Sequence, residues 1–217
     1  MSFYARRAIL PLLLLACLAF AQNPASPSQG AYVEDFETAE VGQVPKEMMV
    51  LAGEFAVADD AGNKVLLLPG SPLESFGLLL GPEQATSIHA RIRATSAGKR
   101  TPEFGVGLAG AAGYKLWLMP ATKELQIIKG EERVARVPYS WTSGSWTLFR
   151  LQLHTSPDGR TRVEGRAWQQ GAQEPRGWMI SFDDAEPPSK GRASVWGTPY
   201  SDTPIAFDDV HVTTQAK

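Results

Sequence analysis

The chain has 217 residues, 43% of them hydrophobic, and carries 21 basic against 23 acidic residues, a formal net charge of −2. This length suits one sizeable core, and the slight acidity argues against a nucleic-acid-binding surface, which is normally basic. The single cysteine cannot form a disulfide within the chain, so the core must hold the fold by itself.

Residues 1–21 have the three parts of a secretory signal. Arg6 and Arg7 precede an apolar run that extends to Phe20, and a small-x-small cleavage site ends at Ala21. The run is shorter than the roughly 20 residues that a membrane-spanning helix needs, and no later stretch is apolar enough to span. We therefore expect cleavage after Ala21 and export to the periplasm, the outside or the cell-envelope surface.

Cys17 lies inside this signal and raises an alternative. Leu14 to Cys17 loosely resembles a bacterial lipoprotein box, in which the cysteine would carry a lipid anchor. Leu18 is an unusual neighbour for that motif, so we favour simple cleavage over lipidation. Residues 22–30, rich in Pro and Ser, are expected to form a flexible leader before one domain over residues 31–214.

The rest of the chain shows short runs of alternating polarity between clusters of Gly, Pro, Asn and Asp. No long stretch has the three-four spacing of an amphipathic helix. The expected strands cover residues 32–37, 54–57, 64–68, 76–80, 87–94, 104–108, 114–119, 125–129, 146–155, 160–168, 178–182, 193–196 and 205–212. This series predicts an all-β fold, a two-sheet antiparallel jelly-roll sandwich.

The last expected strand contains a break in its alternation. Phe207 and Val210 are both apolar but lie an odd number of residues apart, so a regular strand would place them on opposite faces. A β-bulge at Asp208 and Asp209 would keep both apolar side chains in the core. We expect such a bulge, with its two carboxylates pointing away from the core.

Three stretches carry a resemblance to a known family. They are the acidic first strand VEDFE with the glycine-bearing hairpin after it, the central strand WTLFRLQL with the D-G hairpin and the strand that follow, and the ending GRASVWGT…IAFDDVHVT. This pattern resembles the concanavalin A-like lectin/glucanase superfamily, including its laminin G-like jelly rolls. The resemblance implies the same sandwich but leaves function open, since such folds serve as carbohydrate-binding modules, adhesion modules and glycan-cleaving enzymes.

Alternation along the expected strands directs a set of aromatic and charged side chains outward. An indole can cover the C–H face of a pyranose, and arginine and carboxylate groups can bond its hydroxyls. We therefore predict that one sheet face binds a polysaccharide or glycoconjugate. The alternative is a solvated sheet face with cross-strand Arg–Glu pairs and tryptophans packed beneath loops. The predicted ligand-binding residues are Trp117, Trp168, Arg91, Arg93, Arg150, Glu164 and Arg166.

A second group of residues is acidic and belongs to the two ends of the domain. Glu34, Asp35, Asp208 and Asp209 would lie close together if the first and last strands are neighbours. The resemblance implies a structural calcium ion between these strands, and carboxylates are suitable ligands for it. The alternative, which we favour, is that the acids protect a sheet edge against aggregation.

Signatures of catalysis are missing from the sequence. It has no Glu-x-Asp pair of the kind that glycan hydrolases of the family-16 type carry, and no Gly-x-Ser-x-Gly elbow. His89, His154 and His211 lack metal-ligand spacing. We predict no catalytic residue and expect a secreted carbohydrate-binding module. The alternatives are a glycoside hydrolase or lyase with unrecognised carboxylates, and a structural protein-interaction module of the envelope.

Overall fold

The computed structural model describes residues 1, 31–70, 74–199 and 203–214; the rest of the predicted signal, from residue 2, and the leader lie outside the described residues. The described residues form strands and no helix, so they offer no apolar helix that could cross a membrane. The strands are β1 (Tyr32–Glu34), β2 (Met49–Ala52), β3 (Ala56–Asp60), β4 (Asn63–Leu68), β5 (Phe76–Leu80), β6 (Ala85–Ala94), β7 (Glu103–Leu108), β8 (Tyr114–Met119), β9 (Glu124–Lys129), β10 (Glu132–Pro138), β11 (Trp146–Thr155), β12 (Thr161–Gln169), β13 (Ile180–Asp184), β14 (Ala193–Thr198) and β15 (Ile205–Thr214).

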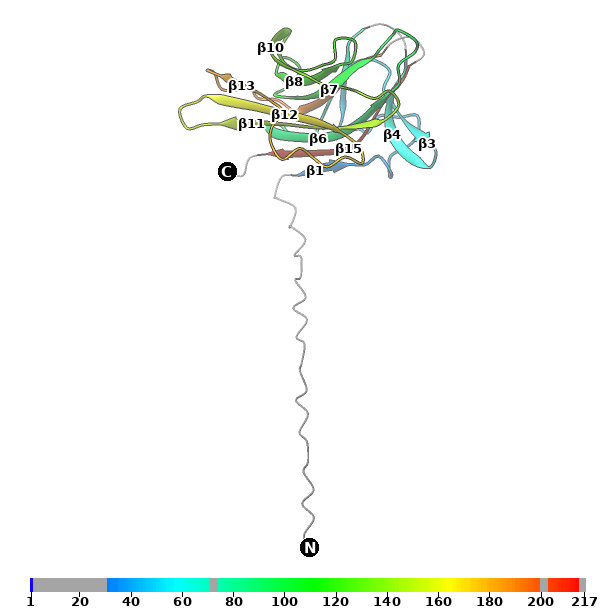
Figure 1. Ribbon diagram of the computed structural model, residues 1–217. Coiled ribbons are helices and arrows are strands. Elements are labelled where there is room, and N and C mark those ends of the chain that lie inside the picture. The colour runs from blue at the N-terminus through cyan, green and yellow to red at the C-terminus, as the bar shows by residue number, and fades with distance from the viewer. Residues whose placement is uncertain (2–30, 71–73, 200–202, 215–217) are drawn as a thin grey trace.

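These strands make two antiparallel sheets, which confirms the predicted sandwich (Figure 1). Sheet A has eight strands in the order β13-β12-β11-β6-β15-β4-β3, with β1 also paired to β15. Sheet B has seven strands in the order β10-β9-β8-β7-β14-β5-β2. Neighbours in each sheet are often far apart in the chain, and β15 lies in the middle of sheet A. β15, the last strand of the domain, therefore pairs with β1, β4 and β6 from its first half.

The core lies between the two sheets and is built by strict alternation. Along β6, Ile88, Ala90 and Ile92 are fully buried, whereas the residues between them are only partly buried. Phe149 of sheet A meets Phe104 of sheet B edge to face, with ring centroids 5.8 Å apart. The alternation of apolar and polar residues in the sequence thus predicts which side chains fill the core and which point outward.

The predicted bulge in the last strand is present. The register of β15 against β6 shifts between Asp208 and His211, and Asp209 has a positive φ of 48°. Phe207 and Val210 are both fully buried as a result. Asp208 is not solvated, however, because only 1% of it is exposed and Arg91 covers it.

The structure differs from the predicted elements in four places. The strands β2 and β10 were not predicted, because the short run MVLA has no alternation and ERVARVP is largely charged. β3 covers Ala56–Asp60 rather than the expected residues 54–57, because the turn that ends it is Ala61-Gly62, with φ values of 57° and 88°. β13 likewise lies two residues later than the expected 178–182 and includes Asp183 and Asp184.

Candidate functional site

The seven predicted ligand-binding residues lie on two different faces of the molecule. Six of them project from strands of sheet A, where Arg150 faces Arg166 across the β11–β12 ladder. Trp117 belongs to β8 of sheet B. The prediction of one shared surface is therefore wrong for Trp117, because alternation tells the outward face of a strand but not the sheet to which it belongs.

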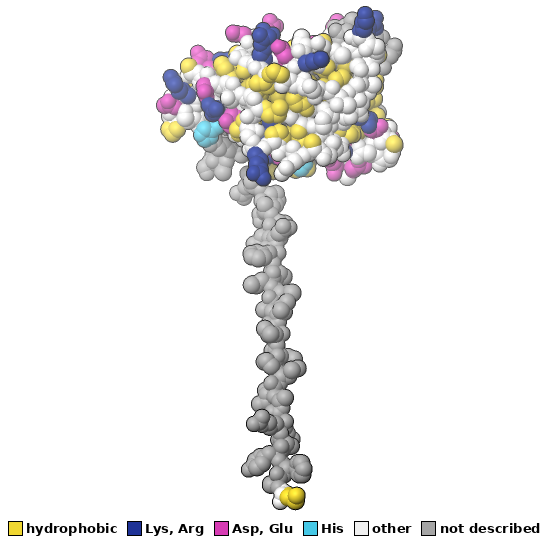
Figure 2. Space-filling view, viewed as in Figure 1, with side chains coloured by type: hydrophobic (Ala, Val, Ile, Leu, Met, Phe, Trp, Pro, Cys, Tyr) yellow, Lys and Arg dark blue, Asp and Glu magenta, His cyan; other side chains and the backbone are white. Residues whose placement is uncertain are grey.

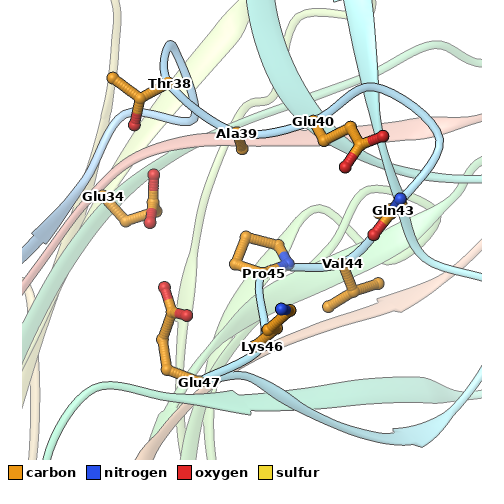
Figure 3. A pocket seen from close by; sticks show the side chains of 9 residues that line it. All are labelled: Glu34, Thr38, Ala39, Glu40, Gln43, Val44, Pro45, Lys46 and Glu47. Atoms are coloured by element: carbon orange, nitrogen blue, oxygen red, sulfur yellow. The ribbon is translucent and has the colours of Figure 1, made fainter.

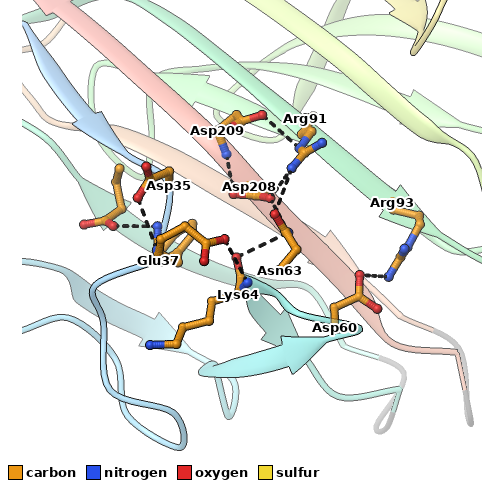
Figure 4. Close-up of polar contacts among 11 residues, drawn as sticks. Asp35, Glu37, Asp60, Asn63, Lys64, Arg91, Arg93, Asp208 and Asp209 are labelled. Carbon is orange, nitrogen blue, oxygen red and sulfur yellow. Dashed lines mark hydrogen bonds and ion pairs between the residues drawn. The ribbon is translucent and has the colours of Figure 1, made fainter.

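The arginines of β6 are occupied by acidic partners. Arg91 Nη2 lies 2.5 Å from Asp208 Oδ2, and Arg93 Nη2 lies 2.6 Å from Asp60 Oδ2 (Figure 4). Both guanidinium groups also stack on the Trp146 ring, at 4.6 Å and 4.8 Å from its centroid. Their positive charge is already neutralised, and the guanidinium groups cover much of that indole.

The arginines of β11 and β12 are covered by the segment between β12 and β13, which crosses the outer side of sheet A (Figure 1). Glu174 forms ion pairs with Arg150 at 3.0 Å and with Arg166 at 2.7 Å. Arg166 also donates to the carbonyl oxygen of Pro175 and lies 4.5 Å from the centroid of the Trp178 ring. These contacts hold the segment against the sheet.

The two remaining residues on this side are also engaged. Trp168 is 9% exposed and stacks on His89, with ring centroids 5.7 Å apart. Glu164 accepts hydrogen bonds from Gln152 at 2.8 Å and from Arg162 at 2.9 Å. The face turned to the viewer in Figure 2 carries hydrophobic side chains over its middle and charged ones mainly near its rim. The ion pairs, hydrogen bonds and ring stacking of these sheet A residues match the alternative of paired charges and covered tryptophans.

The terminal strands pair as expected, but their acids do not converge on one point. Glu34 lies opposite Val210 in the β1–β15 ladder, and one of its carboxylate oxygens accepts the backbone N–H of Phe36 at 2.8 Å. Asp35 accepts the backbone N–H of Glu37 in the same way, at 3.1 Å. Both side chains thus fold back onto their own segment.

The other two predicted calcium ligands are bound to an arginine. Asp208 and Asp209 both form ion pairs with Arg91, and Asn63 donates to Asp208 at 2.9 Å (Figure 4). Among the described residues, no group of three or more His, Cys, Asp or Glu side chains is placed to hold a metal ion. The structure therefore gives the predicted calcium site no ligand set.

A hollow of about 210 Å³ lies beside β1, in the loop that leads to β2. Three carboxylates, those of Glu34, Glu40 and Glu47, line it together with Lys46 (Figure 3). Burial raises the pKa of Glu34 most, and the nearby charge of Glu47 raises it further. The hollow is strongly acidic and offers no aromatic surface.

The outer face of sheet B contains two tryptophans separated by a glycine. Trp196 of β14 lies opposite Gly105 of β7, and Gly105 lies opposite Trp117 of β8. Trp196 also lies opposite Gly77 on its other side. A Cβ atom at Gly77 would overlap the Trp196 ring, so the indole lies flat across β5 only because that residue is glycine.

We expect Gly77→Ala to destabilise the protein by about 2 kcal/mol, because the added methyl group must displace the Trp196 ring. Urea denaturation followed by circular dichroism measures this free energy of unfolding. Gly177→Ala is the matched control, since a Cβ atom there would meet no other atom within 4 Å. Equal stability of the two variants would contradict the flat placement of the indole.

Both indole N–H groups of this face are fixed by hydrogen bonds. Trp117 Nε1 donates to Glu103 at 3.1 Å, and Trp196 Nε1 donates to Ser194 at 2.7 Å. The Lys115 ammonium lies 4.0 Å above the centroid of the Trp196 ring, and burial lowers its pKa. The tryptophans are accordingly only 5% and 9% exposed, and a lysine side chain covers the second of them.

A hollow of about 280 Å³ opens beside Trp117, and its lining includes the polar side chains of Ser75, Glu103, Lys115 and Glu131. In the part of the chain that the structure describes, Glu103, Lys115 and Glu131 take part in no ion pair. This distinguishes them from the charged groups of sheet A. The lining residues are Ser75, Glu103, Lys115, Trp117, Ile128, Gly130 and Glu131.

The sequence pattern alone does not identify Glu103, Glu131 or Trp196 as site residues. A signal was present in the pattern GVG of β7, where Gly105 and Gly107 leave one face of the strand without side chains. Glycine at alternate positions of a central strand marks a place where a bulky group lies close to the backbone. The sequence does not show which group that is, because the pairing of β7 with β14 links residues far apart in the chain.

No family model and no curated protein sequence matches the chain. Solved structures do match it. The carbohydrate binding module CBM66 from Bacillus subtilis is 10% identical, with a TM-score of 0.53, over 77% of this chain and 96% of that one. The PL-14 alginate lyase from Aplysia kurodai is 9% identical, with a TM-score of 0.54, over 78% and 91%. Lectin II from Ulex europaeus is 10% identical, with a TM-score of 0.51, over 84% and 97%. At these identities the likeness is one of fold, and the chain has the concanavalin A-like sandwich.

Proposed function

We propose that this chain is an exported, non-catalytic carbohydrate-binding module whose ligand occupies the hollow beside Trp117 on sheet B. The observation that supports this most is the group of polar side chains that line the hollow without an ion pair, next to two tryptophans. Carboxylates, ammonium groups and hydroxyls are the groups that bond sugar hydroxyls, and an indole covers the apolar face of the ring. The fold is shared with a carbohydrate binding module and a lectin.

The charge of the hollow favours a neutral or amino sugar. Glu103 and Glu131 place two carboxylates in the lining against the single ammonium of Lys115. A uronate or sulfated sugar would meet this net negative charge and be repelled. The hydroxyls of a neutral sugar would donate to the carboxylates, in charge-assisted hydrogen bonds that are stronger than neutral ones.

Lys115 would act as a movable cover over one of the indoles. A cation–π contact at a partly exposed site contributes about 1 kcal/mol, so a ligand can displace the ammonium at small cost. Displacement would uncover the Trp196 ring and free the ammonium to donate to the ligand. The glycines beneath the indole keep it flat in both states.

A pair of matched substitutions tests the site. Glu103→Gln should weaken glycan retention by about tenfold or more, because it removes a hydrogen bond to a charged group. Glu164→Gln should leave retention unchanged, because Glu164 lies on β12 of sheet A, away from the hollow. Binding is measured on an array of neutral, amino and acidic glycans, followed by titration calorimetry with the retained sugar.

Loss of retention in Glu164→Gln with none in Glu103→Gln would move the site to sheet A. Retention of no glycan by the unmodified protein would contradict the proposed function itself. Incubation with the retained glycan separates a binding module from a hydrolase or lyase, because a binding module releases no shorter product.

A further inference from the structure

We infer that a hollow at one end of the sandwich binds a sugar that carries a negative charge, at a site separate from the one beside Trp117. The hollow has a volume of about 400 Å³, which lies within the range of small-molecule sites. It opens between the loops that connect β6 to β7, β8 to β9 and β10 to β11. Its lining residues are Ser96, Thr101, Pro120, Lys123, Ser140, Trp141 and Ser143.

Hydrogen bonds hold these loops together, so the hollow is formed without a ligand. Ser143 Oγ accepts the backbone N–H of Ser96 at 2.8 Å, and the backbone N–H of Tyr139 donates to the carbonyl oxygen of Lys123 at 2.8 Å. The loop of residues 139–145 is thereby fixed to the other two. A site that is formed in advance loses little conformational freedom when a ligand binds.

The charge of the loops is positive, although the chain as a whole is slightly acidic. Lys123 lines the hollow, and Lys99 and Arg100 belong to the same loop as Ser96 and Thr101. None of these cations forms an ion pair with another residue that the structure describes. The loops themselves contain no Asp or Glu. A cleft bordered by one sign of charge concentrates ligands of the opposite sign.

The acidic residues that follow two of these loops have other partners. Glu103, which begins β7, accepts the indole N–H of Trp117 at 3.1 Å. Glu124, which begins β9, forms an ion pair with Arg136 at 3.0 Å. Neither carboxylate lines the hollow, where Lys123 is the only charged residue among the described lining residues. An anionic group beside Lys123 would therefore meet no carboxylate in the lining.

The remaining lining groups suit a sugar rather than a bare anion. Trp141 is partly exposed and packs on the buried Phe104, with ring centroids 5.9 Å apart, which fixes the indole. An indole covers the C–H face of a pyranose, and the hydroxyls of Thr101 and Ser140 can bond those of the sugar. Lys123 would donate to a carboxylate or sulfate in a charge-assisted hydrogen bond. The geometry thus favours a uronate or a sulfated sugar, the class that the acidic hollow on sheet B would repel.

The test follows the indole N–H signal of Trp141 by NMR, with the signal assigned from a Trp141→Phe variant. The probes are a galacturonate oligosaccharide, a sulfated galactan oligosaccharide and a neutral galactan oligosaccharide of the same length. At least one of the two charged probes should shift the signal, and the neutral one should not. Added salt should weaken this binding, because it screens the attraction between the charges.

Lys123→Asn should weaken binding of the charged sugar by about tenfold or more, because a hydrogen bond to a charged group is lost. Asparagine is chosen because it tolerates the positive φ of 55° at this position. Lys46→Asn is the matched control: it removes the same charge from an exposed lysine beside a different hollow and should leave binding unchanged. Circular dichroism confirms that each variant is folded.

The inference is overturned if neither charged probe moves the Trp141 signal, or if Lys123→Asn binds as tightly as the unmodified protein. A response to inorganic sulfate as large as that to the sulfated sugar overturns the assignment to a sugar. Charged sugars that shift the Trp117 signal instead would place the ligand on sheet B and overturn it as well. Failure here leaves the sheet B proposal intact, because that site is tested with neutral and amino sugars.

Discussion

Replacing Arg91 with methionine should lower the free energy of unfolding by about 3 kcal/mol, since it would leave a buried carboxylate without its positive partner. Asp208 is 1% exposed, and its oxygen lies 2.5 Å from Arg91 Nη2. Asn63 and the backbone N–H of Asp209 would still donate to this carboxylate, so the loss should fall short of that for an isolated buried charge. Urea denaturation measures the change.

Two further variants show whether the uncompensated charge is the cause. Asp208→Asn added to Arg91→Met should recover part of the lost stability, because a neutral amide costs less to bury than a carboxylate. Arg136→Met is the control for an exposed pair: the Arg136 side chain is 59% exposed beside Glu124, so its loss should cost less than about 1 kcal/mol. If Arg91→Met costs no more than Arg136→Met, the bulge does not depend on this ion pair.

The stability of the protein should fall by about 2 kcal/mol as the pH drops from 6.5 to 4, through His89 alone. Burial, and then the positive charge of Arg150, lower the pKa of His89 to about 4. Below pH 6.5 the unfolded chain gains a proton at this residue while the folded protein does not, so acid favours unfolding. Below pH 4 both states are protonated and the contribution of His89 stops changing.

His89→Phe isolates this contribution, because phenylalanine retains an aromatic ring against Trp168 and cannot be protonated. The difference in unfolding free energy between His89→Phe and the unmodified protein should grow toward acid pH, measured by urea denaturation at several pH values. His154→Phe, at an exposed histidine, is measured beside it as the control for replacing an imidazole by a phenyl ring. A pH-independent difference for His89→Phe would mean that His89 is protonated in the folded state as readily as in the unfolded chain.

The fold could be predicted from the sequence because alternation survives along most strands. The runs containing Ile88 and Phe149 alternate over many residues, and the slip between Phe207 and Val210 located the bulge. The missed strands, β2 and β10, lack this signal. Every β2 side chain is exposed, so its residues show no alternation between a buried and an exposed face. β10 is an edge strand whose charged residues interrupt the alternation of polar and apolar side chains.

The candidate site could be predicted only in part, because a site depends on which strands are neighbours. The outward direction of Trp117 and of Arg150 followed from alternation, but the two lie on opposite sheets. The partners that occupy the sheet A arginines come from distant segments: Asp208 from the last strand and Glu174 from a connecting loop. Nothing in the local sequence reveals such pairings.

The proposed binding of a sugar on sheet B is tested most directly by observing the indole N–H signals of the six tryptophans by NMR during titration with a retained oligosaccharide. Single Trp→Phe variants assign the signals. We expect the Trp117 signal to shift because its ring lines the hollow, and the Trp196 signal to shift because the sugar would displace Lys115 from its ring. The signals of Trp146 and Trp178, on the sheet A side, should stay in place. Shifts confined to Trp146 and Trp178 would contradict the account and place the ligand on the opposite face.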